Sequence, residues 1–85
     1  MKLFIEKYVD IYRIACDIKF YDNNIAKRLD LSYNEYKSIL CSHGAFYRSL
    51  KPYSAPFLFF DKYEDAQNAL NELDKYLIMV NLRGK

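Results

Sequence analysis

The chain has 85 residues, a formal net charge of +2 at pH 7, 18% aromatic residues, two glycines and two prolines. This length fits a single domain over residues 1–85, and so few glycines and prolines indicate an ordered globular chain. No apolar run approaches the roughly 18 residues of a membrane span, and charge interrupts the N-terminus too early for a signal peptide. We therefore expect a cytoplasmic protein without membrane contact.

The first predicted element is a helix over residues 4–19. Apolar side chains recur at positions 4, 8, 11, 12, 15 and 18, which is the spacing of one helix face. A polar break over residues 21–24 follows, and it favours the start of a second helix.

Two shorter helices are predicted over residues 23–29 and 33–43, with a tight turn between them. Ser32 and Glu35 have the spacing of a capping box, which starts the second of these helices in a defined direction. Gly44 is well placed to end it. The small Ala26 stands where one helix would press on the other, and further apolar residues would fill the angle between the helices: Ile25, Leu29, Leu31, Tyr36 and Ile39.

Residues 24–40 resemble the helix-turn-helix of DNA-binding regulators, in which the second helix enters the major groove. The family pattern has a small residue in the first helix, here Ala26, and an apolar residue and a serine after the turn, here Leu31 and Ser32. The glycine of the family turn is replaced by Asp30, a residue that tolerates the left-handed conformation better than most. Any compact pair of helices needs similar apolar spacing, so the pattern also fits a corner without a DNA-binding role.

A β-hairpin is predicted next, with strand-like residues over 46–51, a turn over 52–56 and a short strand over 57–60. Winged-helix domains carry a hairpin directly after the recognition helix, so this hairpin extends the resemblance. A helix over residues 62–75 and a strand over 77–82 complete the chain. The predicted fold is α+β and winged-helix-like, with the order α-α-α-β-β-α-β, a three-helix core, a β-hairpin and a C-terminal helix and strand.

Helical geometry then indicates which side chains a recognition helix over 33–43 would present to base edges. These outward positions are Tyr33, Asn34, Lys37, Ser38 and Cys41. Asn34 can pair bidentately with adenine, and Lys37 can donate to guanine or to phosphate. Lys27 and Arg28 on the preceding helix would contact the DNA backbone. On the hairpin, Arg48, Lys51 and Tyr53 would reach flanking phosphates or the minor groove.

Catalytic and metal-binding patterns find little support in the sequence. His43 is the only histidine, and Cys41 two positions earlier points away from it on a helix. Two cysteines, Cys16 and Cys41, with one histidine do not supply a four-ligand zinc site. We expect reduced thiols, no enzymatic activity, no cofactor and no metal.

The sequence therefore supports two functions. The first is a small DNA-binding transcriptional regulator that binds double-stranded DNA as a homodimer, encoded by a phage or mobile element with an A/T-rich genome. The positive charge is on the helix-turn-helix side, since residues 1–51 carry nine basic and six acidic side chains. The alternative is a phage-encoded inhibitor that binds a host or defence protein, which the low net charge and the many aromatic side chains favour.

Overall fold

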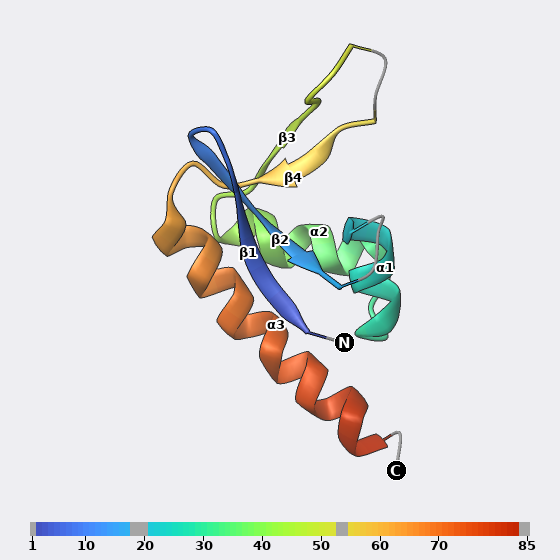
Figure 1. Cartoon of the computed structure of the whole chain (residues 1–85). Coiled ribbons are helices and arrows are strands. Elements are labelled where there is room, and N and C mark those ends of the chain that lie inside the picture. The colour runs from blue at the N-terminus through green and yellow to red at the C-terminus, as the bar shows by residue number, and fades with distance from the viewer. Residues whose placement is uncertain (1, 18–20, 53–54, 84–85) are drawn as a thin grey trace.

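The computed structural model describes residues 2–17, 21–52 and 55–83, and it contains two hairpins, a helix pair and one long helix (Figure 1). The elements follow in the order β1 (Leu3–Tyr8), β2 (Ile11–Cys16), α1 (Tyr21–Arg28), α2 (Tyr33–Ser42), β3 (Phe46–Arg48), β4 (Phe57–Phe59) and α3 (Tyr63–Arg83). The fold is α+β, but its order is β-β-α-α-β-β-α. The predicted order α-α-α-β-β-α-β and the three-helix core are wrong.

The predicted helix over residues 4–19 is instead an antiparallel hairpin of β1 and β2, paired from Leu3 opposite Cys16 to Tyr8 opposite Ile11. In its two-residue turn Val9 has φ +50°, a conformation in which glycine or asparagine is usual. The sequence therefore lacks the turn residue from which a hairpin is normally predicted. Five of the six β2 residues are buried, so β2 shows no alternation of apolar and polar side chains. The apolar positions of this segment consequently imitate a helix face.

One face of the first hairpin and the helix α3 enclose the main core. Leu3, Ile5, Ile14 and Cys16 share this face, and they belong to one apolar cluster with Ala66, Ala69, Leu70 and Leu73 of α3. The small alanines of α3 let the helix approach the sheet closely. The chain after β4 joins the first hairpin as well, because the N–H and C=O groups of Phe60 and Tyr12 bond to each other at 2.7 and 2.9 Å.

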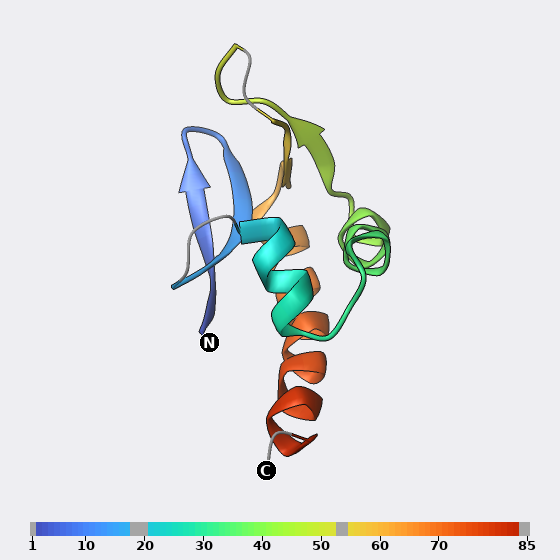
Figure 2. The ribbon, with the colours of Figure 1, turned by 90° about the vertical axis from the view of Figure 1, so that its right-hand side faces the viewer.

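The helix α3 is longer than predicted, because residues 77–82 continue it and do not form a strand. The predicted helix ended at residue 75 and the predicted strand began at residue 77, but no glycine or proline stands between them. Nothing in the sequence therefore ends the helix at this point. The apolar run divides over the helix surface: Leu77 packs against the core, whereas Ile78 and Met79 are exposed. Figures 1 and 2 show the last turns of α3 extending beyond the rest of the fold.

The helix-turn-helix elements and the second hairpin were predicted correctly. α1 and α2 lie within two residues of the predicted helices, and β3 pairs antiparallel with β4 from Phe46 opposite Phe59 to Arg48 opposite Phe57. The second hairpin follows α2 directly and projects away from α3 (Figure 2). Its position beside α2 makes the two elements one continuous surface.

No helix in the described part of the chain combines the length and apolar character needed to cross a membrane. The two cysteines were both expected on helices. Cys16 is in fact buried on β2, whereas Cys41 is exposed on α2 and carries a free thiol.

Candidate nucleic-acid interface

The turn between α1 and α2 is fixed by backbone hydrogen bonds and by Asp30 in the left-handed conformation. Asp30 has φ +58°. Its N–H donates to Lys27 O at 3.2 Å, and the Leu31 N–H donates to Ala26 O at 2.9 Å. This pair of bonds is the Schellman arrangement that usually has glycine in the position of Asp30. The aspartate therefore takes the glycine role that the helix-turn-helix resemblance requires.

The predicted capping box at the start of α2 is confirmed. The Glu35 N–H donates to Ser32 Oγ at 3.1 Å, and the Ser32 N–H donates to Glu35 Oε1 at 3.0 Å. Hydrogen bonding of its carboxylate by the Ser32 backbone N–H, and then by the Ser32 side chain, lowers the pKa of Glu35, although the carboxylate is on the surface. The box also turns this negative charge back toward the turn, which keeps it away from the outward face of α2.

The end of α2 repeats the arrangement found at the end of α1. Gly44 has φ +95°; its N–H donates to Cys41 O at 3.0 Å, and the Ala45 N–H donates to Leu40 O at 3.1 Å. A Cβ atom on Gly44 would lie 3.4 Å from Asp65 Oδ2 of α3. The glycine thus ends α2, as predicted, and directs the chain into β3.

The orientation of α2 agrees with the prediction. Tyr36 and Leu40 are fully buried and anchor the helix, with Ile39 half-buried beside them. Asn34, Ser38 and Cys41 are exposed on the opposite side. The short polar side chains that could contact base edges are therefore on the outer surface of a helix that is capped at both ends.

Tyr33 and Lys37, also predicted for this face, are half-buried because the second hairpin contacts them. The hydroxyl groups of Tyr33 and Tyr47 are hydrogen-bonded at 2.9 Å, and Lys37 Nζ lies 4.9 Å from the centre of the Tyr47 ring. Burial, followed by the hydrogen bond to Tyr47, raises the pKa of Tyr33 well above its usual value. Tyr47 of β3 thus holds two predicted DNA contacts of α2 in place.

The other predicted contacts lie at two ends of this surface. Arg48 and Lys51 are exposed on the second hairpin, whereas Tyr53 lies outside the described residues. Lys27 and Arg28 are exposed at the end of α1, at the far side of the motif from the hairpin (Figure 2). The structure thus brings Tyr33 and Lys37 together with the hairpin, and it does not bring Lys27 and Arg28 to the same place.

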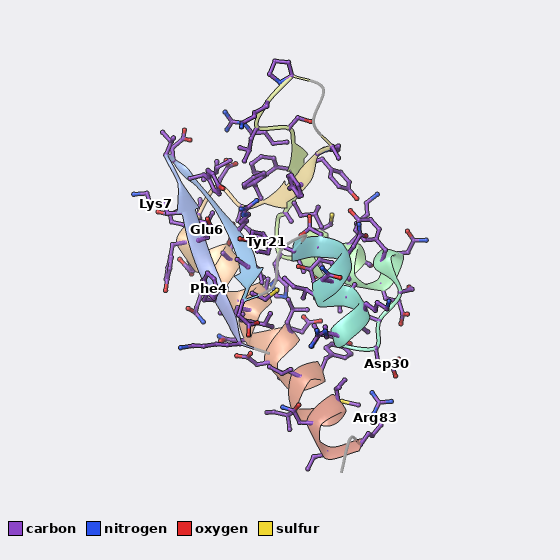
Figure 3. All side chains as sticks on the ribbon, turned by 45° about the vertical axis from the view of Figure 1, so that its right-hand side comes forward. Phe4, Glu6, Lys7, Tyr21, Asp30 and Arg83 are labelled. Carbon is purple, nitrogen blue, oxygen red and sulfur yellow. The ribbon has the colours of Figure 1, made fainter. Side chains whose placement is uncertain are left out.

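An additional cation, Arg83 of α3, lies beside Lys27 and Arg28. The three residues line an open groove of about 390 Å³ together with Asp30 and Val80. Arg83 Nη1 is 3.2 Å from Asp30 Oδ2 (Figure 3). Sequence reasoning missed Arg83, because a strand predicted over residues 77–82 gave no reason to place it against the helix-turn-helix.

A buried arginine supports the base of the second hairpin. Arg13 of β2 is 8% exposed, and it lies 3.3 Å from the Glu6 carboxylate and 2.9 Å from the Tyr8 hydroxyl. Four rings lie within 4.4 to 6.0 Å of its guanidinium carbon: Tyr21, Tyr8, Phe57 and Phe59. Such cation–π contacts join β2, α1 and β4 in one cluster. The only sequence signal was an arginine inside an otherwise apolar run.

Asp22 of α1 also connects the helix-turn-helix to the second hairpin. Its buried carboxylate accepts the Leu58 N–H of β4 at 3.1 Å. Burial raises the pKa of Asp22, while the Leu58 N–H and the charge of Arg13 act in the opposite direction. The Tyr36 hydroxyl is close enough to Asp22 to interact with its carboxylate, and among the described residues it has no other hydrogen-bond partner.

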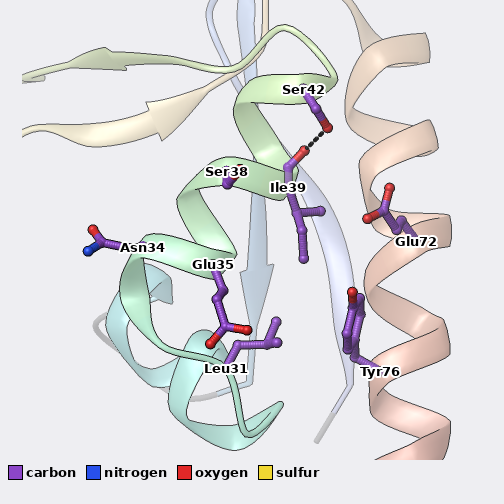
Figure 4. Close-up of a pocket in the computed structure, with 8 residues that line it drawn as sticks. All are labelled: Leu31, Asn34, Glu35, Ser38, Ile39, Ser42, Glu72 and Tyr76. Carbon is purple, nitrogen blue, oxygen red and sulfur yellow. Dashed lines mark hydrogen bonds between the residues drawn. The ribbon is translucent and has the colours of Figure 1, made fainter.

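A second groove, of about 540 Å³, separates α2 from α3 (Figure 4). Apolar side chains of Leu31, Ile39 and Tyr76 line it together with Asn34 and Ser38 at the outward face of α2. At one end of the groove, His43 Nε2 lies 2.9 Å from Glu72 Oε1 of α3. His43 thus connects two helices, and within the described residues no group of three potential metal ligands is found.

Comparison with known proteins gives no match: no family model, no curated protein and no solved structure is similar to the chain at a significant level. The resemblance to DNA-binding helix-turn-helix proteins therefore depends on the motif and its geometry alone.

Proposed function

We propose that this protein binds double-stranded DNA through the outward face of α2 and acts in the cytoplasm as a transcriptional regulator of a phage or mobile element. One observation carries the proposal: Asn34 and Ser38 are exposed on the outer face of a capped helix, and the half-buried Lys37 beside them contacts a hairpin that carries Arg48 and Lys51. A helix with this arrangement can enter the major groove while the hairpin approaches the backbone.

In this arrangement Asn34 and Lys37 read base edges. The exposed Asn34 amide has the donor and acceptor geometry for adenine, and the Lys37 ammonium can donate to guanine. The contact with Tyr47 restricts the Lys37 side chain before DNA arrives, which reduces the entropy lost on binding. Glu35 does not oppose the phosphates, because its carboxylate is held at the Ser32 N–H.

Four further cations supply contacts to the phosphate backbone. Arg48 and Lys51 lie on the hairpin side of α2, and Lys27 and Arg28 lie at the end of α1. Contacts on both sides of a recognition helix fix its register in the groove without reading sequence. Each phosphate neutralised in this way makes binding weaker as salt increases.

The test is the double substitution Asn34→Ala and Lys37→Ala, measured on an operator selected from random duplexes. We expect the preference for this operator over unrelated DNA to be lost, while the thermal unfolding curve changes little. The matched control is Asn68→Ala with Lys62→Ala, which removes the same two residue types from exposed positions at α3. Unchanged operator preference in the α2 variant would contradict the proposal.

A second candidate function is inhibition of a host or defence protein by direct binding. Tyr47 and Leu50 are exposed on the second hairpin, and large apolar side chains at such a site favour protein contacts. Replacement of Leu50 by Lys would weaken a protein complex of this kind, whereas it would strengthen or preserve binding to DNA. The two functions therefore predict opposite effects of one substitution.

A further inference from the structure

The end of α3 places a cation beside the cations of the helix-turn-helix. Lys27, Arg28 and Arg83 line one open groove, and Asp30 is the carboxylate that lines it with them. The groove therefore carries three positive charges against one negative charge. This is a local excess that the net charge of +2 for the whole chain does not indicate. Such an excess favours an anionic ligand.

Two of these cations are not neutralised by the fold. Within the described residues, none of the ion pairs includes Lys27 or Arg28, and both side chains are exposed. Cations in the last turn of a helix complement its dipole, which accounts for each of them separately. The dipole of α1 does not explain why the end of a second helix brings Arg83 to the same groove.

The contact with Asp30 holds Arg83 at the groove and leaves it able to bind an anion. Arg83 Nη1 lies 3.2 Å from Asp30 Oδ2, and the two side chains are 61% and 71% exposed (Figure 3). A guanidinium has five N–H donors, so one contact with a carboxylate leaves donors for a phosphate. Because the pair is exposed, solvent screens it, and Asp30 can also separate from Arg83 at little cost.

The groove lies at the end of the candidate interface that is opposite the second hairpin. Arg48 and Lys51 are on the hairpin side of α2, whereas the ends of α1 and α3 lie on the other side of it (Figure 2). The major groove of DNA is about 12 Å wide and has a phosphate backbone along each edge. A helix that enters it therefore has phosphates on both sides, and cations are present on both sides of α2.

We propose that the groove lined by Lys27, Arg28 and Arg83 binds a backbone phosphate of the duplex that α2 enters. The inference rests on the proposed DNA binding and deepens it, because it makes the end of α3 a part of the interface. A guanidinium can bind two phosphate oxygens at once, which fixes the position of the backbone. This contact sets the register of α2 on the duplex and carries no sequence information.

Two substitutions test the inference in opposite directions. Arg83→Gln removes one cation, so we expect the affinity for a random-sequence duplex to fall about tenfold at about 50 mM salt, with a salt slope less steep by about 0.9. Asp30→Asn removes the negative charge, keeps an acceptor oxygen for Arg83 and tolerates the left-handed conformation. We expect this variant to bind about threefold more tightly at low salt, because a nearby carboxylate no longer repels the phosphate.

Lys75→Gln is the matched control. Lys75 is an exposed cation on the same helix, but it does not line the groove, so its loss should leave the salt slope unchanged. Equal losses of affinity in Arg83→Gln and Lys75→Gln would overturn the inference, because they would reflect the general charge of the chain. Thermal unfolding curves, recorded in parallel, check that all three variants are folded.

The same titrations distinguish this inference from the proposed function. Arg83→Gln should weaken binding equally on a selected operator and on unrelated DNA, whereas Asn34→Ala with Lys37→Ala should remove the preference between them. Intact operator preference with an unchanged salt slope in Arg83→Gln would overturn this inference alone. A wild type that binds no duplex even at low salt would overturn both.

Discussion

The two hairpins of this protein are built from similar residue types but differ in how they are supported. The first has six-residue strands, one face on α3 and the other around Arg13. The second has three-residue strands and is held at its base by Phe60, Asp22 and the Arg13 cluster, while Tyr47, Arg48 and Leu50 are exposed beyond it. The strand β2 of the first hairpin is enclosed, whereas the second hairpin extends from a fixed base.

The enclosed residues form the structural scaffold, and the projecting residues form the surface that can bind another molecule. Residues that are buried on both sides are constrained by packing, and substitutions there act on stability. Residues that project beyond a fixed base are available for contacts with another molecule. The exposed residues of the second hairpin and of α2 should therefore tolerate substitutions that the buried residues of β2 do not.

The largest expected effect is that of Phe60→Ala. Phe60 is fully buried and bonds through its backbone to Tyr12, so truncation leaves a cavity where the two hairpins meet. We expect the free energy of unfolding to fall by about 3–5 kcal/mol. The matched substitution Tyr47→Ala, at a 40% exposed position on the second hairpin, should cost less than about 1 kcal/mol. Chemical denaturation measures both, and equal losses would contradict the distinction between the fixed base of the second hairpin and its exposed strand.

The next largest effect on stability is expected at Asp22, because its carboxylate connects α1 to the second hairpin. Asp22→Ala leaves the buried Leu58 N–H without an acceptor and should cost about 1–3 kcal/mol. Asp22→Asn keeps an acceptor oxygen and should cost less. The measurement is urea denaturation of both variants and the wild type at several pH values.

The pH dependence of that comparison follows from the raised pKa of Asp22. A carboxyl group whose pKa is higher in the folded state contributes stability that is complete below the unfolded-state pKa, about 4. This contribution is lost as the pH rises through the folded-state pKa. The wild type should therefore lose stability relative to Asp22→Asn between acidic and neutral pH. A constant difference across this range would show that burial does not dominate the electrostatics of Asp22.

A smaller effect is expected at Gly44, which directs the chain from α2 into the second hairpin. Gly44→Ala forces a side chain into a backbone with φ +95° and toward Asp65, so we expect a loss of about 1–2 kcal/mol. Asp30→Gly, at the equivalent place after α1, should have the opposite sign. Thermal unfolding of the two variants tests the assignment, and a neutral Gly44→Ala would contradict it.

The smallest effect concerns Val9, at the tip of the first hairpin. A β-branched side chain at φ +50° is strained, and its 92% exposure means that it gains little from packing. Val9→Gly should raise the free energy of unfolding by about 1 kcal/mol. Val9→Ala, which keeps a Cβ atom, should gain less than half as much in the same denaturation experiment. A loss of stability in Val9→Gly would show that the valine makes a contact that its exposure does not reveal.

Local signals explain which parts of the fold could be predicted. Ser32, Glu35 and Gly44 act within one turn of helix, so their roles are visible in sequence, and the motif around them was predicted correctly. The first hairpin depends instead on long-range burial of β2 and on a turn with Val9 where glycine is expected. The length of α3 was missed because an apolar run alone does not distinguish a strand from a helix.

The candidate site likewise combines features that local sequence patterns predict with contacts that depend on long-range packing. Helical spacing was sufficient to place Asn34, Ser38 and Cys41 on the outer face of α2, whereas Lys37 is half-buried against the second hairpin. The contact of Tyr47 with Tyr33 and Lys37, and the approach of Arg83 to Asp30, join residues that are distant in sequence. No local pattern encodes such contacts, because they depend on how whole elements pack.

The central claim is that α2 and its flanking cations bind duplex DNA, and a salt titration tests it most directly. Fluorescence anisotropy of a labelled random-sequence duplex would measure the affinity at several salt concentrations. If α2 binds DNA, the dissociation constant should be micromolar. The logarithm of the association constant should fall linearly with the logarithm of the salt concentration, with a slope of about −0.9 for each phosphate contacted. Absence of binding even at low salt would contradict it.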